Sequence, residues 1–228
     1  MTGNVAIHGT EVHIDTSALE LPYASHAYQI VEDTVIISLS SNNTSTTPAE
    51  KTETSLLSIP EDNRNVLALS FEGVHLWTAP ESPHSSSVDE IYQELFFVTG
   101  RLLVTHQDGH LYELSIENGS IVGSWPIDSL PIADREIDLD GPVKDVIHTD
   151  ELIIVNIAGV EWPKSDTYAF EKDGSLRWRS EETCRNLKLE DETLWAIEPA
   201  GGRMWERTPI DLQTGLKGDG EVFEGYPN

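Results

Sequence analysis

The sequence has 228 residues, of which 38% are hydrophobic, enough to bury a sizeable core as one large domain or two small ones. Forty acidic residues against fourteen Lys and Arg give a formal net charge of −26, and a field of this sign opposes direct contact with phosphate backbones. We therefore expect no nucleic-acid partner. No window approaches the ~18 apolar residues of a membrane span, so we expect no membrane partner either.

The acidic residues are spread along the whole chain rather than gathered in one tail. Such a surface repels itself in dilute buffer, whereas concentrated salt screens the repulsion. We interpret this acidic protein as halophilic, from a haloarchaeon or its virus; the alternative is an ordinary acidic protein. The single cysteine, Cys184, excludes an intrachain disulfide. The first residues have neither a basic flank nor an apolar run, so we expect no signal peptide. The expected localisation is cytoplasmic, or the virion if the protein is viral.

Short β-rich runs follow one another along the chain, separated by Gly, Asp, Asn and Pro, and no long stretch keeps a helical period. Two short runs come first, and we expect them to be outer strands that close the ring by completing a blade of the other terminus. Four modules with the same order of strands follow. The expected strands are 5–8 and 11–14; then 28–32, 34–40, 66–71 and 74–78; then 94–98, 102–106, 110–116 and 121–125; then 143–148, 152–157, 167–171 and 176–179; then 185–189, 193–197, 204–212 and 221–223.

The modules share a turn glycine that is followed, in most copies, by a tryptophan. Segments 68–77 and 169–178 both have an Ala, a Gly five residues later and a Trp four beyond it. A looser copy spans 112–125, and 209–215 keeps the turn without the Trp. Self-similarity at roughly 50 residues indicates a repeat architecture. The residues that this repeat assigns a structural role are Gly73, Trp77, Gly119, Trp125, Gly174, Trp178 and Gly215.

These patterns predict an all-β fold, a small β-propeller of four four-stranded antiparallel blades, with five blades as the alternative. We expect a single domain over 1–228. Its parts are N-terminal strands in 1–21, blades in 22–80, 88–128 and 141–181, and a degenerate blade in 184–228. The segments 40–54, 80–87, 129–141 and 160–166 are expected to be irregular loops on which binding specificity depends.

The repeated segments resemble the pyrroloquinoline-quinone-type, WD-like β-propeller repeat, most closely at Tyr168, Ala169, Gly174 and Trp178. The resemblance implies that each Trp docks between neighbouring blades. Many proteins with this repeat bind no quinone and serve as protein-interaction scaffolds. The quinone enzymes have about twice as many blades and a vicinal cysteine pair, whereas this chain has one cysteine. We therefore expect no cofactor.

The residues that could carry chemistry are few. His106, Asp108 and His110 surround one tight hairpin, which makes a metal site conceivable. Two histidines on either side of a turn usually only flank it, and the sequence shows no third metal ligand to join them. Trp162 lies outside the repeat position and is a candidate exposed anchor for a partner. No nucleophile, phosphate-loop or dinucleotide motif is present. We expect no catalytic, cofactor or metal site.

The function that the sequence favours is a non-enzymatic protein–protein interaction scaffold adapted to high salt, with Trp162, His106 and His110 as candidate partner contacts. The protein partner is not identified by the sequence. One alternative is a structural subunit of a larger assembly, either a virion or a multiprotein complex. Another is a glycan-binding protein or metal-dependent enzyme that uses the loop aromatics or the two histidines.

Overall fold

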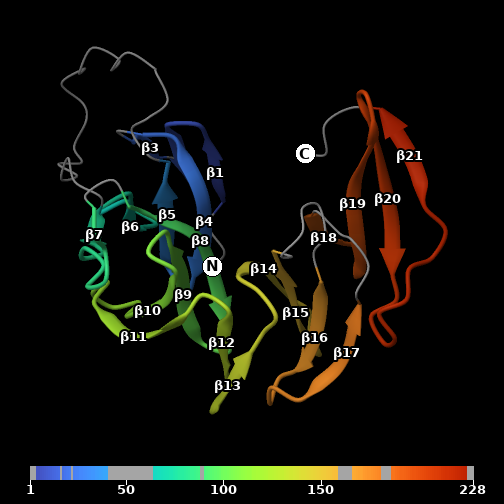
Figure 1. Cartoon of the computed structure of the whole chain (residues 1–228). Helices are drawn as coiled ribbons and strands as arrows, with labels where there is room; N and C mark the ends of the chain where they lie inside the picture. The colour runs from blue at the N-terminus through green and yellow to red at the C-terminus, as the bar shows by residue number, and fades with distance from the viewer. Residues whose placement is uncertain are drawn as a thin grey trace. The chain divides into compact units, whose positions relative to one another are not determined.

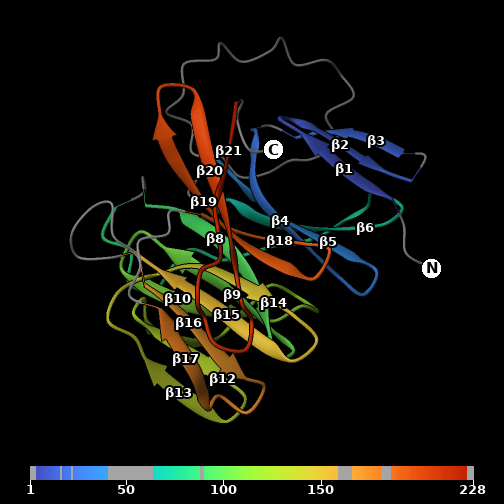
Figure 2. The same ribbon diagram turned by 90° about the vertical axis from the view of Figure 1, so that its right-hand side faces the viewer.

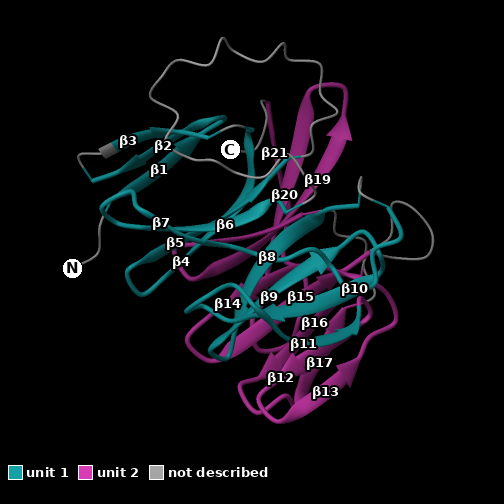
Figure 3. Ribbon diagram, turned by 90° about the vertical axis from the view of Figure 1, so that its left-hand side faces the viewer, with its two compact units in different colours: residues 1–126 teal, residues 127–228 magenta. Residues whose placement is uncertain are grey.

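The computed structural model describes residues 4–15, 17–21, 23–40, 64–87, 90–158, 166–180 and 186–224. These residues form β-strands joined by turns (Figure 1). Within them, no helix is long and apolar enough to cross a membrane. The chain divides into two compact units, Met1–Pro126 and Ile127–Asn228 (Figure 3).

The first unit contains three antiparallel sheets, each built from strands that are consecutive in the chain. The N-terminal sheet has three strands and the two that follow have four each; we call the four-stranded sheets blades. The sheets comprise β1 (Val5–His8), β2 (Glu11–Ile14) and β3 (Ser17–Glu20); β4 (Ser25–Val31), β5 (Thr34–Leu39), β6 (Val66–Ser70) and β7 (His75–Thr78); and β8 (Tyr92–Val98), β9 (Arg101–His106), β10 (His110–Leu114) and β11 (Ile121–Pro126).

The second unit contains a hairpin and two further blades, again with consecutive antiparallel strands. The hairpin pairs two short strands, and each blade has four. They comprise β12 (Ser129–Ile132) and β13 (Arg135–Asp138); β14 (Val143–His148), β15 (Leu152–Ile157), β16 (Thr167–Glu171) and β17 (Leu176–Ser180); and β18 (Asn186–Glu190), β19 (Thr193–Gly201), β20 (Met204–Ile210) and β21 (Glu221–Glu224).

The cores lie between stacked sheets, because side chains alternate between the two faces of a strand. In the first unit, Leu67 and Leu69 of β6 pack toward Val12 of the N-terminal sheet, which lies beside this blade in Figure 2. Ala68, between them, packs on the other face with Leu102 of the next blade. The second unit repeats this stacking, with Ala169 and Trp178 against Leu194 and Ala196.

The strands of the four modules agree with the sequence prediction to within a few residues, apart from β19, which extends to Gly201. The N-terminal region differs, because 17–20 adds a third strand to the two expected ones. Among the described residues these three strands pair only with one another, and the β18–β21 blade has four strands of its own. The N-terminal strands therefore form a separate sheet rather than completing that blade.

The expectation of an irregular connection over 129–141 was wrong, because β12 and β13 form a hairpin there. Leu130 and Ile132 are buried in it, whereas the acidic residues Asp134, Glu136 and Asp138 gave the segment the composition of a loop. The expected loops at 40–54 and 160–166 lie outside the described residues, except for Ser40 and Asp166.

Candidate functional site

Two of the repeat tryptophans lie against the turn glycine of the next blade. The Trp77 indole packs so closely on Gly119 that a Cβ there would come within 2.4 Å of Trp77 Cε3. Its Nε1 donates a 2.8 Å hydrogen bond to the Ile116 carbonyl. Trp178 has the same relationship to Gly215, and its Nε1 donates to the Leu212 carbonyl at 2.8 Å. The two tryptophans therefore link neighbouring blades within their units.

The other repeat positions differ from this arrangement. Trp125 is only half-buried, and the Arg101 guanidinium lies 6.0 Å from its ring centroid. The space over Gly174 is occupied by Ile132 and Arg135 of the β12–β13 hairpin. The space over Gly73 is occupied by Leu19 of β3. The place that an indole has elsewhere is thus taken by Leu19 at Gly73, and by Ile132 and the aliphatic part of Arg135 at Gly174.

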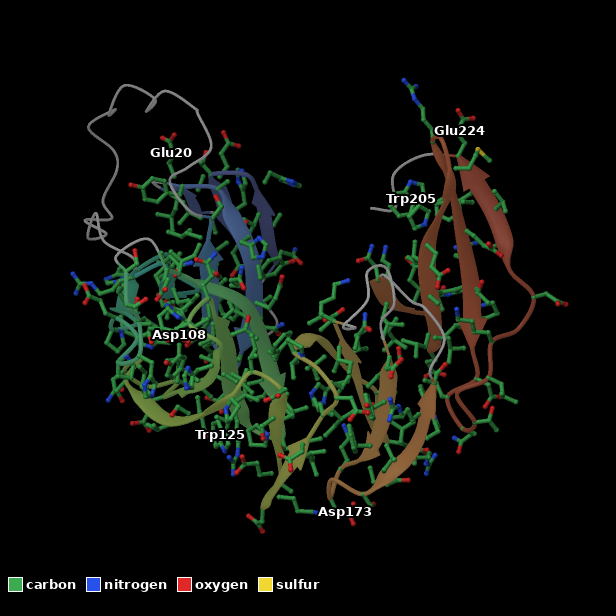
Figure 4. The ribbon with its side chains drawn as sticks, viewed as in Figure 1. Glu20, Asp108, Trp125, Asp173, Trp205 and Glu224 are labelled. Carbon is green, nitrogen blue, oxygen red and sulfur yellow. The ribbon has the colours of Figure 1, made fainter. Side chains whose placement is uncertain are left out.

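The carboxylate of Asp108, in the turn between β9 and β10, is surrounded by polar side chains (Figure 4). Its side chain is only 3% exposed. It accepts hydrogen bonds from Ser82 Oγ and, at 2.7 Å, from the Tyr112 hydroxyl. His106 Nδ1 lies 3.0 Å from Asp108 Oδ2, and His110 Nδ1 lies 3.2 Å from Oδ1. Because Ser82 belongs to the connection between β7 and β8, the carboxylate ties that connection to the β9–β10 hairpin.

We call Ser82, His106, Asp108 and Tyr112 the Asp108 cluster. Its electrostatics favour one set of protonation states. Burial opposes ionisation of Asp108, but hydrogen bonds from Ser82 and Tyr112 and the nearby His106 outweigh it and lower the carboxyl pKa. Burial lowers the pKa of His106 despite the attraction of Asp108, and its buried Nε2 has no hydrogen-bond partner. Burial likewise raises the pKa of the Tyr112 hydroxyl. At neutral pH an ionised carboxylate therefore faces a neutral imidazole and a hydroxyl donor.

Two imidazole rings lie above this buried cluster. The rings of His84 and His110 are stacked, with centroids 4.3 Å apart and an interplanar angle of 14°. His84 is exposed, and the His110 side chain is 31% exposed. The backbone N–H of His84 donates to Ser82 Oγ at 3.1 Å, so the position of His84 depends on the Asp108 cluster. We call His84 and His110 the histidine pair.

The described part of the connection that carries His84 is held by hydrogen bonds to Glu90. Ser85 Oγ and the Ser86 backbone N–H both donate to Glu90 Oε2 at 2.9 Å, and Ser86 Oγ donates to Glu90 Oε1 at 3.0 Å. Pro83 fixes one backbone angle next to His84. The expected loop at 80–87 is thus an ordered segment that presents polar side chains at fixed positions.

The cluster has the side chains of hydrolytic chemistry but not their arrangement. Ser82 Oγ bonds directly to Asp108 and to the Tyr112 hydroxyl, whereas the serine of a catalytic triad bonds to an imidazole. Within the described ranges, no group of three or more His, Cys, Asp or Glu side chains could hold a metal ion. The arrangement supports a structural role for Asp108 and a presenting role for the histidine pair.

The sequence-predicted contact residues have different positions. His106 is not a surface contact, because its side chain is 1% exposed and packs at 4.7 Å between ring centroids against Tyr92. His110 is accessible, whereas Trp162 lies outside the described residues. Sequence analysis missed Ser82 and His84. Their contacts join residues about 26 apart, and no local motif signals that separation.

Three solved structures match most of this chain. The β-propeller domain of Cps50 (Swd1) from Myceliophteria thermophila matches with a TM-score of 0.58 and 12% identity, over 98% of this chain and 69% of that one. BamB from Moraxella catarrhalis matches with a TM-score of 0.48 and 17% identity, over 98% of this chain, which spans 62% of BamB. The computationally designed Ika8 protein matches with a TM-score of 0.46 and 9% identity, over 97% and 74% of the two chains.

The likeness to the Swd1 domain, together with the blade-type sheets, shows that the fold is a β-propeller. Among the described residues, besides the β12–β13 hairpin, four sheets have four strands and the N-terminal sheet has three, which confirms the prediction of four blades with five as the alternative. A comparison with curated proteins found no match. The model of the family described as "Domain of unknown function (DUF7957)" matches residues 2–124 and 127–217, segments that coincide closely with the two compact units. The chain therefore belongs to the DUF7957 family.

Proposed function

We propose that the protein is a non-enzymatic binding module that presents the histidine pair and the 80–87 connection to a protein partner. The observation that carries this proposal is the Asp108 cluster. The buried Asp108 carboxylate bonds to Ser82 and Tyr112, and beside it a pair of stacked imidazoles lies at the surface.

A fixed surface is useful for binding because association costs free energy when loops and side chains must be ordered. Here the connection is already ordered by Ser82, bonded to Asp108, and by Glu90, bonded to Ser85 and Ser86. Exposed rings in a rigid setting are typical anchors of protein interfaces. The histidine pair therefore has the properties of a contact surface rather than those of a reaction centre.

The proposal includes adaptation to concentrated salt, as in the cytoplasm of a halophile. The support is the formal charge of −26 in a chain with only fourteen Lys and Arg. In molar salt, charges more than a few ångströms apart are screened from one another. Partner binding would then depend on ring stacking, hydrogen bonds and apolar contacts, which the histidine pair can supply.

The test is partner capture in ~3 M KCl, where long-range charge attraction is screened. The immobilised wild-type protein, the H84A/H110A variant and a matched control, H75A, are compared on lysate from a salt-adapted cell, with mass spectrometry of the bound proteins. His75 is an exposed histidine of β7 that bonds Thr78 and lies outside the Asp108 cluster. Light scattering of the protein alone establishes whether it self-associates.

We expect a defined protein to be retained by the wild type and by H75A, and retained at least about tenfold less by H84A/H110A. If all three proteins retain the same partner equally, the protein is a binding module but the histidine pair is not part of its interface. Retention of no protein by the wild type would overturn the proposed function.

A further inference from the structure

Among the strands that the structure describes, β1 is an edge strand of the N-terminal sheet and pairs on one side only. This sheet has three strands where each blade has four, and β1 is its outermost strand in the hydrogen-bonded order β1-β2-β3. The Asp15 N–H donates to the Asn4 carbonyl at 2.8 Å, and β1 pairs with β2 in simple antiparallel register. Because bonding directions alternate along an antiparallel strand, Ala6 and His8 bond to β2, whereas the N–H and C=O groups of Val5 and Ile7 point away from it.

The neighbouring blade has an apolar face that extends beyond this edge. Tyr28 of β4 is paired with Ile37 of β5, and Ile30 is paired with Val35, so all four side chains lie on one face of the blade. Val35 and Ile37 are buried against the N-terminal sheet. Tyr28 and Ile30, one strand further along, are 44% and 45% exposed. A fourth strand beside β1 would lie over them.

The charge of this region selects the occupant. Residues 1–40, which contain β1 to β5, have five carboxylates and no Lys or Arg. All five are exposed: Glu11, Asp15, Glu20, Glu32 and Asp33. A second copy of this chain would bring the same acidic surface against itself, and like charges across an interface oppose association. A segment that carries Lys or Arg complements it.

We infer that the outer edge of β1 accepts an extended strand of a partner protein, with alternating apolar side chains over Tyr28 and Ile30 and with Lys or Arg on its opposite face. Main-chain hydrogen bonds to Val5 and Ile7 supply affinity, and the apolar face supplies specificity, as in other additions of a strand to a sheet edge. A strand of about six residues is long enough to follow β1 and cross both exposed side chains. This inference rests on the proposed binding function and assigns it a second surface, away from the histidine pair.

The experiment uses a displayed library of random 10-residue peptides, selected on the full-length protein in ~0.15 M KCl, where Lys or Arg still gains from nearby carboxylates while attraction beyond about 8 Å is screened. Individual peptides are then measured against the wild type, Y28K/I30K and the matched control V74K/V122K. The control replaces two exposed apolar residues elsewhere in the same unit. Amide exchange of Val5 to His8 is followed by NMR with and without peptide.

We expect selected peptides with apolar residues at every second position and Lys or Arg between them. Their affinity falls at least about tenfold in Y28K/I30K but not in the control, and the amides of Val5 and Ile7 become protected while those of Ala6 and His8 are protected throughout.

Peptides without this period, peptides insensitive to Y28K/I30K, or unchanged exchange at Val5 and Ile7 would overturn the inference. So would a dimer of the free protein that Y28K/I30K dissociates, because the occupant would then be a second copy. None of these outcomes alters partner capture by the histidine pair, so the inference can fail while the proposed function stands.

Discussion

The Trp77 indole occupies the space that a side chain at Gly119 would need. Gly119 has a φ of +70°, and an added Cβ would lie 2.4 Å from Trp77 Cε3 and 2.8 Å from Cδ2. The same indole donates its Nε1–H to the Ile116 carbonyl, three residues before the glycine. One residue of β7 thus fixes the position of the turn that joins β10 to β11.

G119A should lower the free energy of unfolding by about 2–4 kcal/mol, because it combines a left-handed backbone with an overpacked contact. The measurement is urea unfolding at constant KCl, followed by tryptophan fluorescence. G100A is the matched control. Gly100 has a φ of +84° and no atom within 4 Å of its added Cβ, so only the backbone cost of about 1 kcal/mol is expected. Equal losses in the two variants would show that the Trp77 contact contributes nothing to stability.

The repeat could be predicted because its turn glycines and strand patterns are local features. Gly119 and Gly174 both follow a polar pair that favours a turn, and both have the positive φ that this position needs. The sequence does not predict which side chain lies over a turn glycine where no tryptophan does. Leu19 and Ile132 reach their glycines from strands whose short, mixed sequences have no strong β signal of their own.

D108N should destabilise the first unit by about 2–4 kcal/mol, measured by urea unfolding at pH 7.5. The buried carboxylate accepts hydrogen bonds from both Ser82 and Tyr112. In D108N an NH₂ group replaces one carboxylate oxygen, and this group cannot accept a hydrogen bond from the donors around it. We also expect faster amide exchange in 82–87, since Ser82 holds that segment.

D173N is the matched control for this substitution. Asp173 occupies a similar hairpin turn between β16 and β17, and its carboxylate accepts from the Ser175 N–H and hydroxyl at the surface. A loss of less than about 1 kcal/mol is expected there, because water can replace the lost bonds. If D108N costs no more than D173N, Asp108 does not organise the connection.

The sequence predicts the hairpin of the Asp108 cluster but not which of its side chains are buried. The hairpin with His106, Asp108 and His110 was visible in the sequence, but which histidine is buried depends on the pairing of β9 with β8. His106 pairs with Tyr92 and lies inside, whereas His110 begins the next strand and stays accessible. His84 joins it only through the fold, so the histidine pair has no signature in the chain.

Stability should also depend on pH through His148. Burial, and secondarily the charge of Lys172, lowers the pKa of His148 from 6.5 to about 4. The unfolded chain therefore binds a proton below about pH 6.5, which the folded protein does not bind until about pH 4. The contribution of neutral His148 is complete above pH 6.5 and is lost as the pH falls toward 4.

The expected loss between pH 7 and pH 4 is about 1–2 kcal/mol, since partial exposure to water reduces the effect of the shift. Urea unfolding of the wild type and H148Q at half-unit pH intervals measures it. The difference between the two curves isolates His148 from the other titrating groups. Parallel curves over this range would contradict the assignment.

The net charge predicts that salt stabilises the protein. At a spacing of ~10 Å in water, two like charges repel by about 0.4 kcal/mol before screening, and the excess of carboxylates makes many such pairs. Raising KCl from ~0.1 M to ~3 M removes most of this repulsion. The free energy of unfolding should therefore rise by several kcal/mol.

The triple variant E11Q/E20Q/E32Q removes three exposed carboxylates from the N-terminal region, which has no Lys or Arg. It should be more stable than the wild type at ~0.1 M KCl and equal to it at ~3 M. A variant that differs from the wild type by the same amount at both salt concentrations would show that the effect of the carboxylates is not electrostatic repulsion.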